Sequence, residues 1–278
     1  MRLGPVTLDV VDAGRFLFDG GGMFGVVPKV IWNELQPADD RNRLTLALWL
    51  LLIRTPQETV LVDTGFGKRF SQIEEKMYGP VPSPAVDDAL RAMGVAPEDV
   101  DAVVLTHLHA DHAGGATVRA GDCVVPTFPG ARYYVHRREW DDAVNPNAIS
   151  AAAYRGDDYL PLEEAGLVEL VGDTHHIGSH IVLERTGGHT AGHLMVRVTT
   201  DDGDAIYPAD LIPSRHHFRA PYTASVDLYP LEVVERKLDV LARAARDGTI
   251  IILDHDPAGA VGRAVEGKKG RYYFEETT

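Results

Sequence analysis

The sequence HLHADH at residues 107–112 is the most informative stretch for the fold. It places His107, His109, Asp111 and His112 within one short segment. Imidazole nitrogens and carboxylate oxygens are the ligands that zinc and similar divalent ions prefer in proteins. At this histidine content, the pattern is expected by chance in on the order of 1 in 1,000 proteins. A solvated histidine-rich loop is therefore the weaker alternative, and the segment predicts a metal site.

The residues around this segment indicate where it lies in the fold. The apolar run at residues 101–105 predicts a buried strand that ends just before it. Ligand sites of α/β sheets lie at the carboxyl ends of strands, and Gly114 and Gly115 let the chain turn tightly afterwards. Because the adjacent side chains of Asp111 and His112 diverge, one ion could not collect all four ligands, whereas two ions could.

The pattern of an apolar run followed by a possible ligand recurs downstream. His189 lies in a glycine-flanked turn between apolar runs at 181–184 and 194–198. Asp210 and His255 each follow a further apolar run. A single histidine at a strand end is more often a hydrogen-bonded loop residue than a ligand. In this order after residues 107–112, the three residues predict a site with two metal ions.

Apolar runs also predict strands at residues 44–53 and 59–62, which a turn at 55–58 joins. Helical spacing of apolar residues predicts a helix at 84–93, which Gly94 ends, and another at 231–241. The sequence contains neither a recognisable linker nor a tandem repeat.

Taken together, these motifs resemble those of the metallo-β-lactamase superfamily of hydrolases, over nearly the whole chain. The sequence Val62-Asp63-Thr64-Gly65 matches the first motif and residues 107–112 match the second, while His189, Asp210 and His255 match the third, fourth and fifth. The resemblance implies an α/β fold, a four-layer αββα sandwich of two mixed sheets flanked by helices, as a single domain over residues 1–278.

The resemblance also implies a ligand set for two divalent ions, zinc foremost, with iron, manganese or cobalt as alternatives. His109 favours zinc and hydrolysis, because iron-containing redox relatives carry a glutamate at that position. Asp63 and His193 are expected to support the ligands from outside the centre. The implied ligands are His107, His109 and His189 for the first ion, Asp111, His112 and His255 for the second, and Asp210 as the bridge between both.

The reaction implied by the resemblance is hydrolysis by a hydroxide held between two ions, which lower the pKa of bound water to about 7. Asp111 and Asp210 are the expected catalytic residues, with Asp210 passing a proton to the leaving alkoxide. Residues 22–32 and 209–213 are similar to a bacterial quorum-quenching subgroup that opens N-acyl-homoserine lactones, which implies a lactonase.

Other activities remain open at this point. The same centre could serve a phosphotriesterase, an arylesterase or a glyoxalase II-like thioesterase, although no basic cluster for a glutathione carboxylate is evident. An iron-dependent redox enzyme is a less favoured alternative of another class. A purely structural zinc site would need four ligands rather than seven.

The substrate pocket departs from the better-known lactonases, which carry a tyrosine a few residues after the bridging aspartate. Here Leu211, Ile212 and Pro213 follow Asp210, and the candidates to replace that tyrosine are Ser214, His216, Tyr222 and Tyr229. Aromatic residues in two segments, the glycine-rich stretch at 20–32 and residues 214–229, suit an apolar substrate group. The expected substrate contacts are Phe24, Trp32, His216 and Tyr222; alternatively, these aromatics only cover the core.

Composition restricts the partners and the location. The net charge of −14 argues against nucleic acid, which requires a basic stripe. Cys123 is the only cysteine, so no internal disulfide can form, and it is expected to behave as a small hydrophobe. The absence of a signal peptide and of an apolar run long enough to span a bilayer predicts a soluble, cytoplasmic protein without membrane partners. A small ester or lactone is the expected substrate, and both monomer and homodimer remain open.

Overall fold

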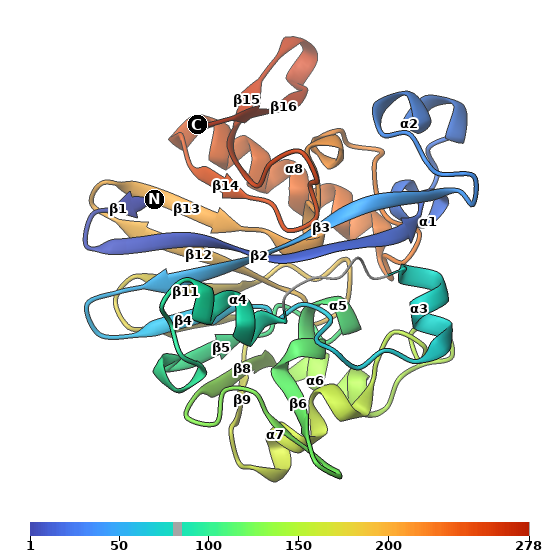
Figure 1. The fold of residues 1–278 in the computed structure, drawn as a ribbon. Helices are drawn as coiled ribbons and strands as arrows, with labels where there is room; N and C mark the ends of the chain where they lie inside the picture. Colours follow the sequence, from blue (N-terminus) through green and yellow to red (C-terminus); the bar gives the residue numbers. More distant parts are fainter. Residues whose placement is uncertain (80–84, 278) are drawn as a thin grey trace.

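The computed structural model describes residues 1–79 and 85–277. Within them, two seven-stranded sheets pack face to face and helices cover their outer faces (Figure 1). The predicted four-layer αββα sandwich is therefore confirmed. Over the same residues, no helix combines the length and the apolar character that crossing a membrane requires.

The first sheet combines antiparallel and parallel strands in the order β1-β2-β3-β4-β5-β8-β9. Its neighbours are antiparallel from β1 to β4 and parallel from β4 to β9. The strands predicted at 44–53 and 59–62 are β3 and β4. The bounds are β1 (Arg2–Leu3), β2 (Val6–Asp19), β3 (Arg43–Arg54), β4 (Thr59–Val62), β5 (Ala102–Val104), β8 (Arg132–His136) and β9 (Val168–Val171).

The second sheet runs in the order β10-β11-β12-β13-β14-β15-β16 and is antiparallel except for the parallel pair β13–β14. Strands β11, β12, β13 and β14 correspond to the predicted apolar runs. The bounds are β10 (Thr174–Ile177), β11 (Ile181–Arg185), β12 (Leu194–Thr200), β13 (Gly203–Tyr207), β14 (Ile250–Ile252), β15 (Val261–Glu266) and β16 (Tyr272–Glu276).

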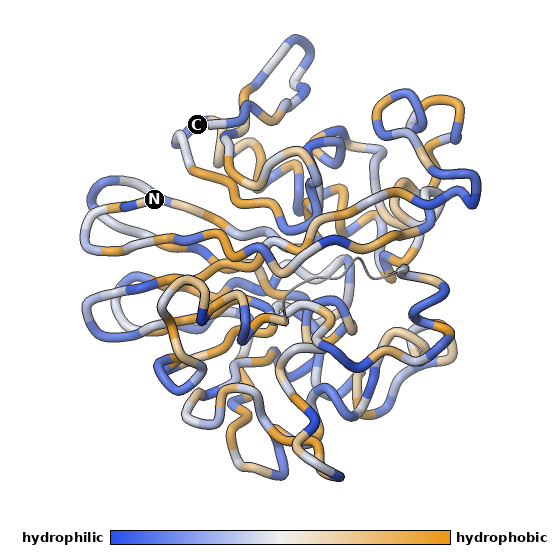
Figure 2. The backbone as a smooth tube through the Cα atoms, in the orientation of Figure 1, coloured by the Kyte–Doolittle hydropathy of each residue, from blue (hydrophilic) through white to orange (hydrophobic). Residues whose placement is uncertain are grey.

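Three apolar layers hold the sandwich together. The central layer joins the two sheets, with residues such as Leu51 and Val62 from the first facing Leu183 and Val196 from the second. An outer layer packs the first sheet against its helices, and another packs the second sheet against α8 (Pro230–Asp247). Figure 2 shows the apolar stretches along the strands and hydrophilic stretches in many of the peripheral loops.

The helices follow the predictions in part. The helix predicted at 231–241 is α8, and that at 84–93 is α4 (Val86–Ala92), with residue 84 itself outside the described residues. Cys123, expected to behave as a small hydrophobe, is exposed on β7 (Cys123–Pro126), which pairs with β6 (Thr117–Ala120). The remaining α-helices are α1 (Gly20–Phe24), α2 (Lys29–Leu35), α3 (Gln72–Tyr78), α5 (Ala110–Ala113), α6 (Arg137–Val144) and α7 (Leu160–Glu164).

Part of the glycine-rich stretch forms helix α1. The Asp19 carboxylate accepts a hydrogen bond from the Gly22 amide and caps the helix. A Cβ at Gly20 would lie 2.3 Å from the Trp32 ring. This glycine is therefore required by close packing of α1 against α2.

Five loops meet at one edge of the sandwich. They follow the carboxyl ends of β4, β5, β11, β13 and β14, which run in the same direction within each sheet. Each loop carries one or more of the predicted site residues.

Candidate metal centre

The loops bring the predicted ligands into two overlapping groups. The first consists of His107, His109, His189 and Asp210, each offering one ligand atom within 4.8 Å of the others. The Nε2 atom of His189 lies 3.0 Å from Nδ1 of His109 and 3.1 Å from Oδ2 of Asp210. The Nε2 atom of His107 lies 3.9 Å from the same oxygen.

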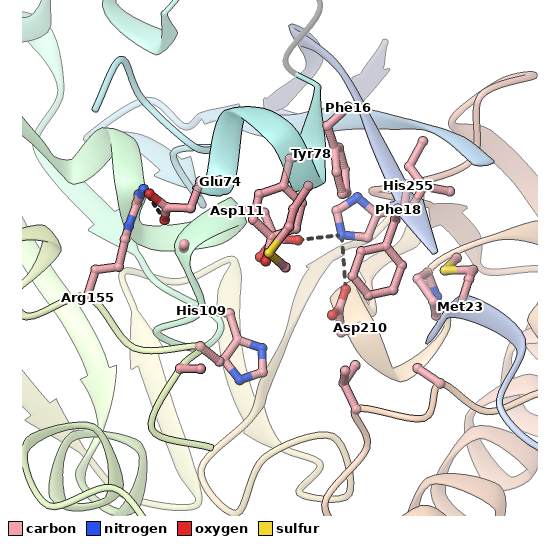
Figure 3. Close-up of a pocket in the computed structure, with 18 of the residues that line it drawn as sticks. Phe16, Phe18, Met23, Glu74, Tyr78, His109, Asp111, Arg155, Asp210 and His255 are labelled. Carbon is pink, nitrogen blue, oxygen red and sulfur yellow. Dashed lines mark hydrogen bonds and ion pairs between the residues drawn. The ribbon is translucent and has the colours of Figure 1, made fainter. Parts of the chain in front are cut away.

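The second group consists of His112, Asp210, Asp254 and His255, again within 4.8 Å. The Nε2 atoms of His112 and His255 lie 3.4 and 3.2 Å from Oδ1 of Asp210. Asp111 Oδ2 lies 3.8 and 3.6 Å from the same two nitrogens, and Figure 3 shows it beside His255. Asp210 thus presents Oδ2 to the first group and Oδ1 to the second, as a bridging carboxylate would.

Hydrogen bonds from outside the centre orient the imidazole rings. The Nδ1 atom of His112 lies 2.9 Å from Asp63 Oδ2, and that of His189 lies 2.7 Å from Asp227 Oδ1. His255 Nδ1 lies 2.8 Å from the Ala47 carbonyl oxygen and donates to it. Such partners leave each Nε2 facing the centre and fix the tautomer.

The backbone is strained at two points beside the centre. Asp63 and Ala209, which precedes Asp210, adopt the left-handed region with φ of 59° and 45°. Residues other than glycine occupy this region at an energetic cost, and such positions cluster at functional sites. At Gly115 a Cβ would lie 2.2 Å from the Thr64 carbonyl oxygen. A glycine there therefore lets the backbone after the 107–112 segment pack closely against the turn that follows Asp63.

Glu139 connects two of the ligand loops and was not predicted from the sequence. Its carboxylate is buried and accepts hydrogen bonds from the Leu108 amide, the Tyr154 hydroxyl and the Thr190 hydroxyl. These bonds fasten the 107–112 segment to the His189 loop.

His193 lies just outside the two groups. Its ring is buried 5.4 Å from that of His107, and Nδ1 lies 2.6 Å from the Thr186 hydroxyl. The Thr186 amide also donates to the His193 carbonyl oxygen at 2.9 Å. His193 therefore stabilises the turn that carries His189.

Burial and neighbouring charges shift the pKa values of the ligand groups. Burial lowers the pKa of His107 well below its ordinary value, and His112 and His109 lower it further. Burial also lowers the pKa of His255, but Asp254 and Asp210 outweigh it and raise that pKa to about 10. The second group therefore keeps a proton when no cation is bound, and an incoming cation has to displace it.

Unsatisfied atoms test whether cations fit this centre. Within the part of the chain that the structure describes, several buried nitrogen and oxygen atoms that could bind a metal lack a hydrogen-bond partner. They are Nε2 of His107, His112 and His255, Oδ1 of Asp210 and both carboxylate oxygens of Asp254. Buried polar atoms are nearly always satisfied. This combination of imidazoles and carboxylates therefore fits two divalent cations.

The centre lies at the bottom of a pocket of about 440 Å³ (Figure 3). His109, Asp111, His189, Asp210 and His255 form its floor. The rest of the lining is mainly apolar and includes Phe16, Phe18, Met23, Ile73, Met77 and Val226. The pocket therefore suits a substrate with an apolar group beside its reacting carbon.

The charged pair in this lining is internally satisfied. Arg155 donates to Glu74 at 3.1 Å and to Asp158 at 2.7 Å, and also to two backbone carbonyl oxygens. Glu74 in turn accepts from the Ser71 amide. Neither charge is left to pair with an ionic substrate.

The predicted substrate contacts lie elsewhere. Phe24, Trp32 and Tyr222 are buried and His216 is half-buried, and none of the four belongs to the lining of this pocket. Phe24 stacks on Trp32 and contacts the rings of Tyr222 and His216. These rings pack against one another, which favours the alternative that they cover the core, and direct substrate contact stays a prediction for them.

Tyr78 is the lining tyrosine that the sequence did not reveal. It lies at the end of α3 beside Asp111 (Figure 3). Burial and the Asp111 charge raise the pKa of Tyr78 to about 12, so its phenol is a hydrogen-bond donor at neutral pH. The four candidates to replace the lactonase tyrosine, Ser214, His216, Tyr222 and Tyr229, do not line this pocket.

Known proteins are similar to this chain in sequence and in fold. The signature described as the metallo-beta-lactamase superfamily matches residues 49–255. An N-acyl homoserine lactonase of Bacillus cereus is 25% identical, covering 96% of this chain and 96% of that protein. A probable metal-dependent hydrolase from Staphylococcus aureus has a TM-score of 0.90 at 25% identity, covering 100% of both chains.

A dizinc quorum-quenching lactonase, AidC, in complex with its product N-hexanoyl-L-homoserine, shares the fold. Its TM-score is 0.82 at 20% identity, covering 100% of this chain and 96% of that one. The resemblance drawn from the motifs is confirmed, and the chain belongs to the metallo-beta-lactamase superfamily.

Proposed function

We propose that this superfamily hydrolase is a dinuclear lactonase, one domain over residues 1–278, that opens N-acyl homoserine lactones or related lactones. The observation that carries the proposal is the double donor group at the floor of an apolar pocket. The Bacillus cereus relative named as an N-acyl homoserine lactonase adds support over nearly the whole chain.

We assign His107, His109 and His189 to the first cation and Asp111, His112 and His255 to the second, with Asp210 shared. Imidazole-rich sites suit zinc. When bound, such cations activate water near neutral pH and polarise the substrate carbonyl. The cytoplasm is the proposed location, because a chain with one cysteine forms no internal disulfide, which fits a reducing compartment.

The proposed proton transfer uses Asp111. Asp111 and Asp210 both line the pocket, but both oxygens of Asp210 lie within 3.4 Å of an imidazole nitrogen, and the side chain of Asp111 is more exposed, at 21% against 14%. After water attacks the carbonyl carbon and the ring ester bond breaks, the leaving alkoxide takes up a proton. The Asp111 carboxylate would accept the proton from water and deliver it to the alkoxide, the transfer that the sequence had suggested for Asp210.

Tyr78 has a separate role in this proposal. Its protonated phenol would donate a hydrogen bond to the substrate carbonyl oxygen, which becomes more negative in the transition state. The paired state of Arg155 and Glu74 disfavours glutathione thioesters, which need a cationic partner for their carboxylates.

The test is a turnover panel on the metal-loaded protein. It compares N-acyl homoserine lactones with an aryl phosphotriester, an aryl ester and a glutathione thioester. We expect the highest kcat/KM for the lactones and loss of turnover after chelation. Lactone turnover no faster than that of the chelated protein, or a higher kcat/KM for another class, would overturn the proposal.

A further inference from the structure

Asp254 is a buried carboxylate without an evident structural role. It follows β14, is 1% exposed, and neither of its oxygens has a hydrogen-bond partner among residues 1–79 and 85–277. Over the same residues, His255 is the only ion-pair partner that we find for it. A charged carboxylate in such a position is unfavourable unless a proton or a cation compensates it.

Its neighbour Asp256 provides the contrast. Asp256 is equally buried two residues further along, yet it accepts hydrogen bonds from the Arg215 amide and guanidinium and from the Ala258 amide. The fold therefore satisfies one carboxylate fully and leaves the other facing the second donor group.

Asp254 approaches that group from the protein interior. Its Oδ2 lies 3.6 Å from His255 Nε2, and it belongs to the cluster with His112 and Asp210 within 4.8 Å. Asp111 approaches the same histidine nitrogen at 3.6 Å but lines the pocket. Three carboxylates thus meet two imidazoles, a concentration of negative charge that a divalent cation would compensate.

We infer that Asp254 is an additional ligand of the second cation, which makes the two sites chemically unequal. This inference rests on the proposed two-metal centre. The first site has three imidazoles and the shared Asp210, whereas the second has two imidazoles and the carboxylates of Asp111, Asp210 and Asp254. Oxygen donors suit Mn²⁺ and imidazoles suit Zn²⁺, so the preference for zinc over manganese is weaker at the second site.

The experiment titrates metal-free wild type, Asp254→Asn and Asp256→Asn with Zn²⁺ or Mn²⁺ against a competing chelator. Bound metal is counted by elemental analysis, and bound Mn²⁺ is followed by electron paramagnetic resonance. In wild type, we expect two ions per chain. The ratio of Zn²⁺ affinity to Mn²⁺ affinity should be at least about tenfold smaller at the second site than at the first.

Asp254→Asn should still bind the first ion. Its affinity for the second ion should fall by at least about tenfold, and more for Mn²⁺ than for Zn²⁺. Asp256→Asn is the matched control and should keep wild-type affinity for both ions. Two ions bound to Asp254→Asn with wild-type affinity would overturn the inference, as would equal metal preference at both sites of wild type. If Asp254→Asn fails to fold, the relative affinities of the two wild-type sites for Zn²⁺ and Mn²⁺ alone test the inference. Wild type that binds no second ion would instead defeat the two-metal centre itself.

Discussion

The floor of the pocket and its outer wall are built in different ways. The floor, together with the proposed ligands His107 and His112 behind it, lies on loops that follow strand ends. Its imidazoles are oriented by buried partners such as Asp63 and Asp227. The wall, formed by Ile73, Met77 and Tyr78 of α3 together with Val226, is more open. Ile73 is 70% exposed and Met77 is 52% exposed, and α3 has no buried residue.

Polar contacts and one aromatic ring attach the wall, since Tyr78 packs on Phe16 and Phe66. Helix α3 begins with a capping box between Ser71 and Glu74, and Glu74 also pairs with Arg155. Substitution of exposed side chains usually changes stability little, whereas buried networks tolerate little change. The floor therefore determines the chemistry, and the wall can vary to select the substrate.

The largest effect is expected at His107, a proposed ligand buried behind the floor. His107→Ala should lower kcat/KM on the order of a thousandfold and release one ion, because a buried imidazole donor is lost. Turnover and bound metal are measured together. His176→Ala, at an exposed histidine on β10, is the control and should match wild type. A metal-free His107→Ala with full turnover would contradict the division between floor and wall.

The second effect concerns a buried lysine outside the pocket lining. Lys237 of α8 is buried and donates to the Tyr222 carbonyl oxygen, and burial lowers its pKa from 10.5 to about 8. Between these values the unfolded chain binds more protons, so the free energy of unfolding rises with pH, by up to about 3 kcal/mol.

Lys237→Met should abolish this rise. Denaturant unfolding between pH 8 and 10.5, with excess chelator present, measures the slope in both proteins. The same slope in both would show that Lys237 does not titrate abnormally.

Asp63→Ala should have the third effect, a loss of about 10- to 100-fold in metal affinity or activity, because Asp63 orients His112 without facing the substrate. Chelator competition measures the affinity. Asp101→Ala, which removes an exposed carboxylate before β5, is the control. Unchanged metal affinity would mean that the ring of His112 needs no support from Asp63.

Tyr78→Phe tests a polar group of the wall. Loss of one hydrogen bond to the transition state should lower kcat/KM about tenfold while metal content stays unchanged. Steady-state kinetics on a lactone provide the measurement. Tyr229→Phe, outside the pocket lining, should behave as wild type. Equal kinetics of the two variants would exclude Tyr78 from the reaction.

The smallest effect is expected at the outer wall. Ile73→Asp should raise KM several-fold for long-chain lactones and leave short-chain ones nearly unchanged, since each buried methylene contributes about 0.8 kcal/mol. A series of acyl lengths measures this. Ile149→Asp is the control, because Ile149 is 85% exposed and absent from the lining. A uniform loss across all lengths would place the acyl chain elsewhere.

The same comparison explains what the sequence could predict. Apolar runs followed by His, Asp or both predicted strands and a two-metal site at their ends, because strand periodicity and ligand chemistry are local signals. The four-layer fold followed from the resemblance of these motifs to the superfamily. Strands β1, β2, β6 to β10, β15 and β16 lie outside the predicted elements. Asp254 was visible beside His255, but its burial depends on how β14 packs.

The wall could not be predicted in this way. Phe24 and Tyr222 seemed suitable for a substrate because they are aromatic, but aromatic residues pack in a core for the same reason. Tyr78 and Asp227 carry no local pattern, since their place beside Asp111 and His189 arises only from tertiary packing.

The division of the ligands between the two sheets has a practical consequence. His107, His109, Asp111 and His112 precede the exposed residues 144–149, and His189, Asp210, Asp254 and His255 follow them. Fragments separated there would each hold half a coordination sphere. Their reassociation would be driven by the apolar layer between the sheets and strengthened by the cation, so a split reporter built on this chain would respond to divalent metal.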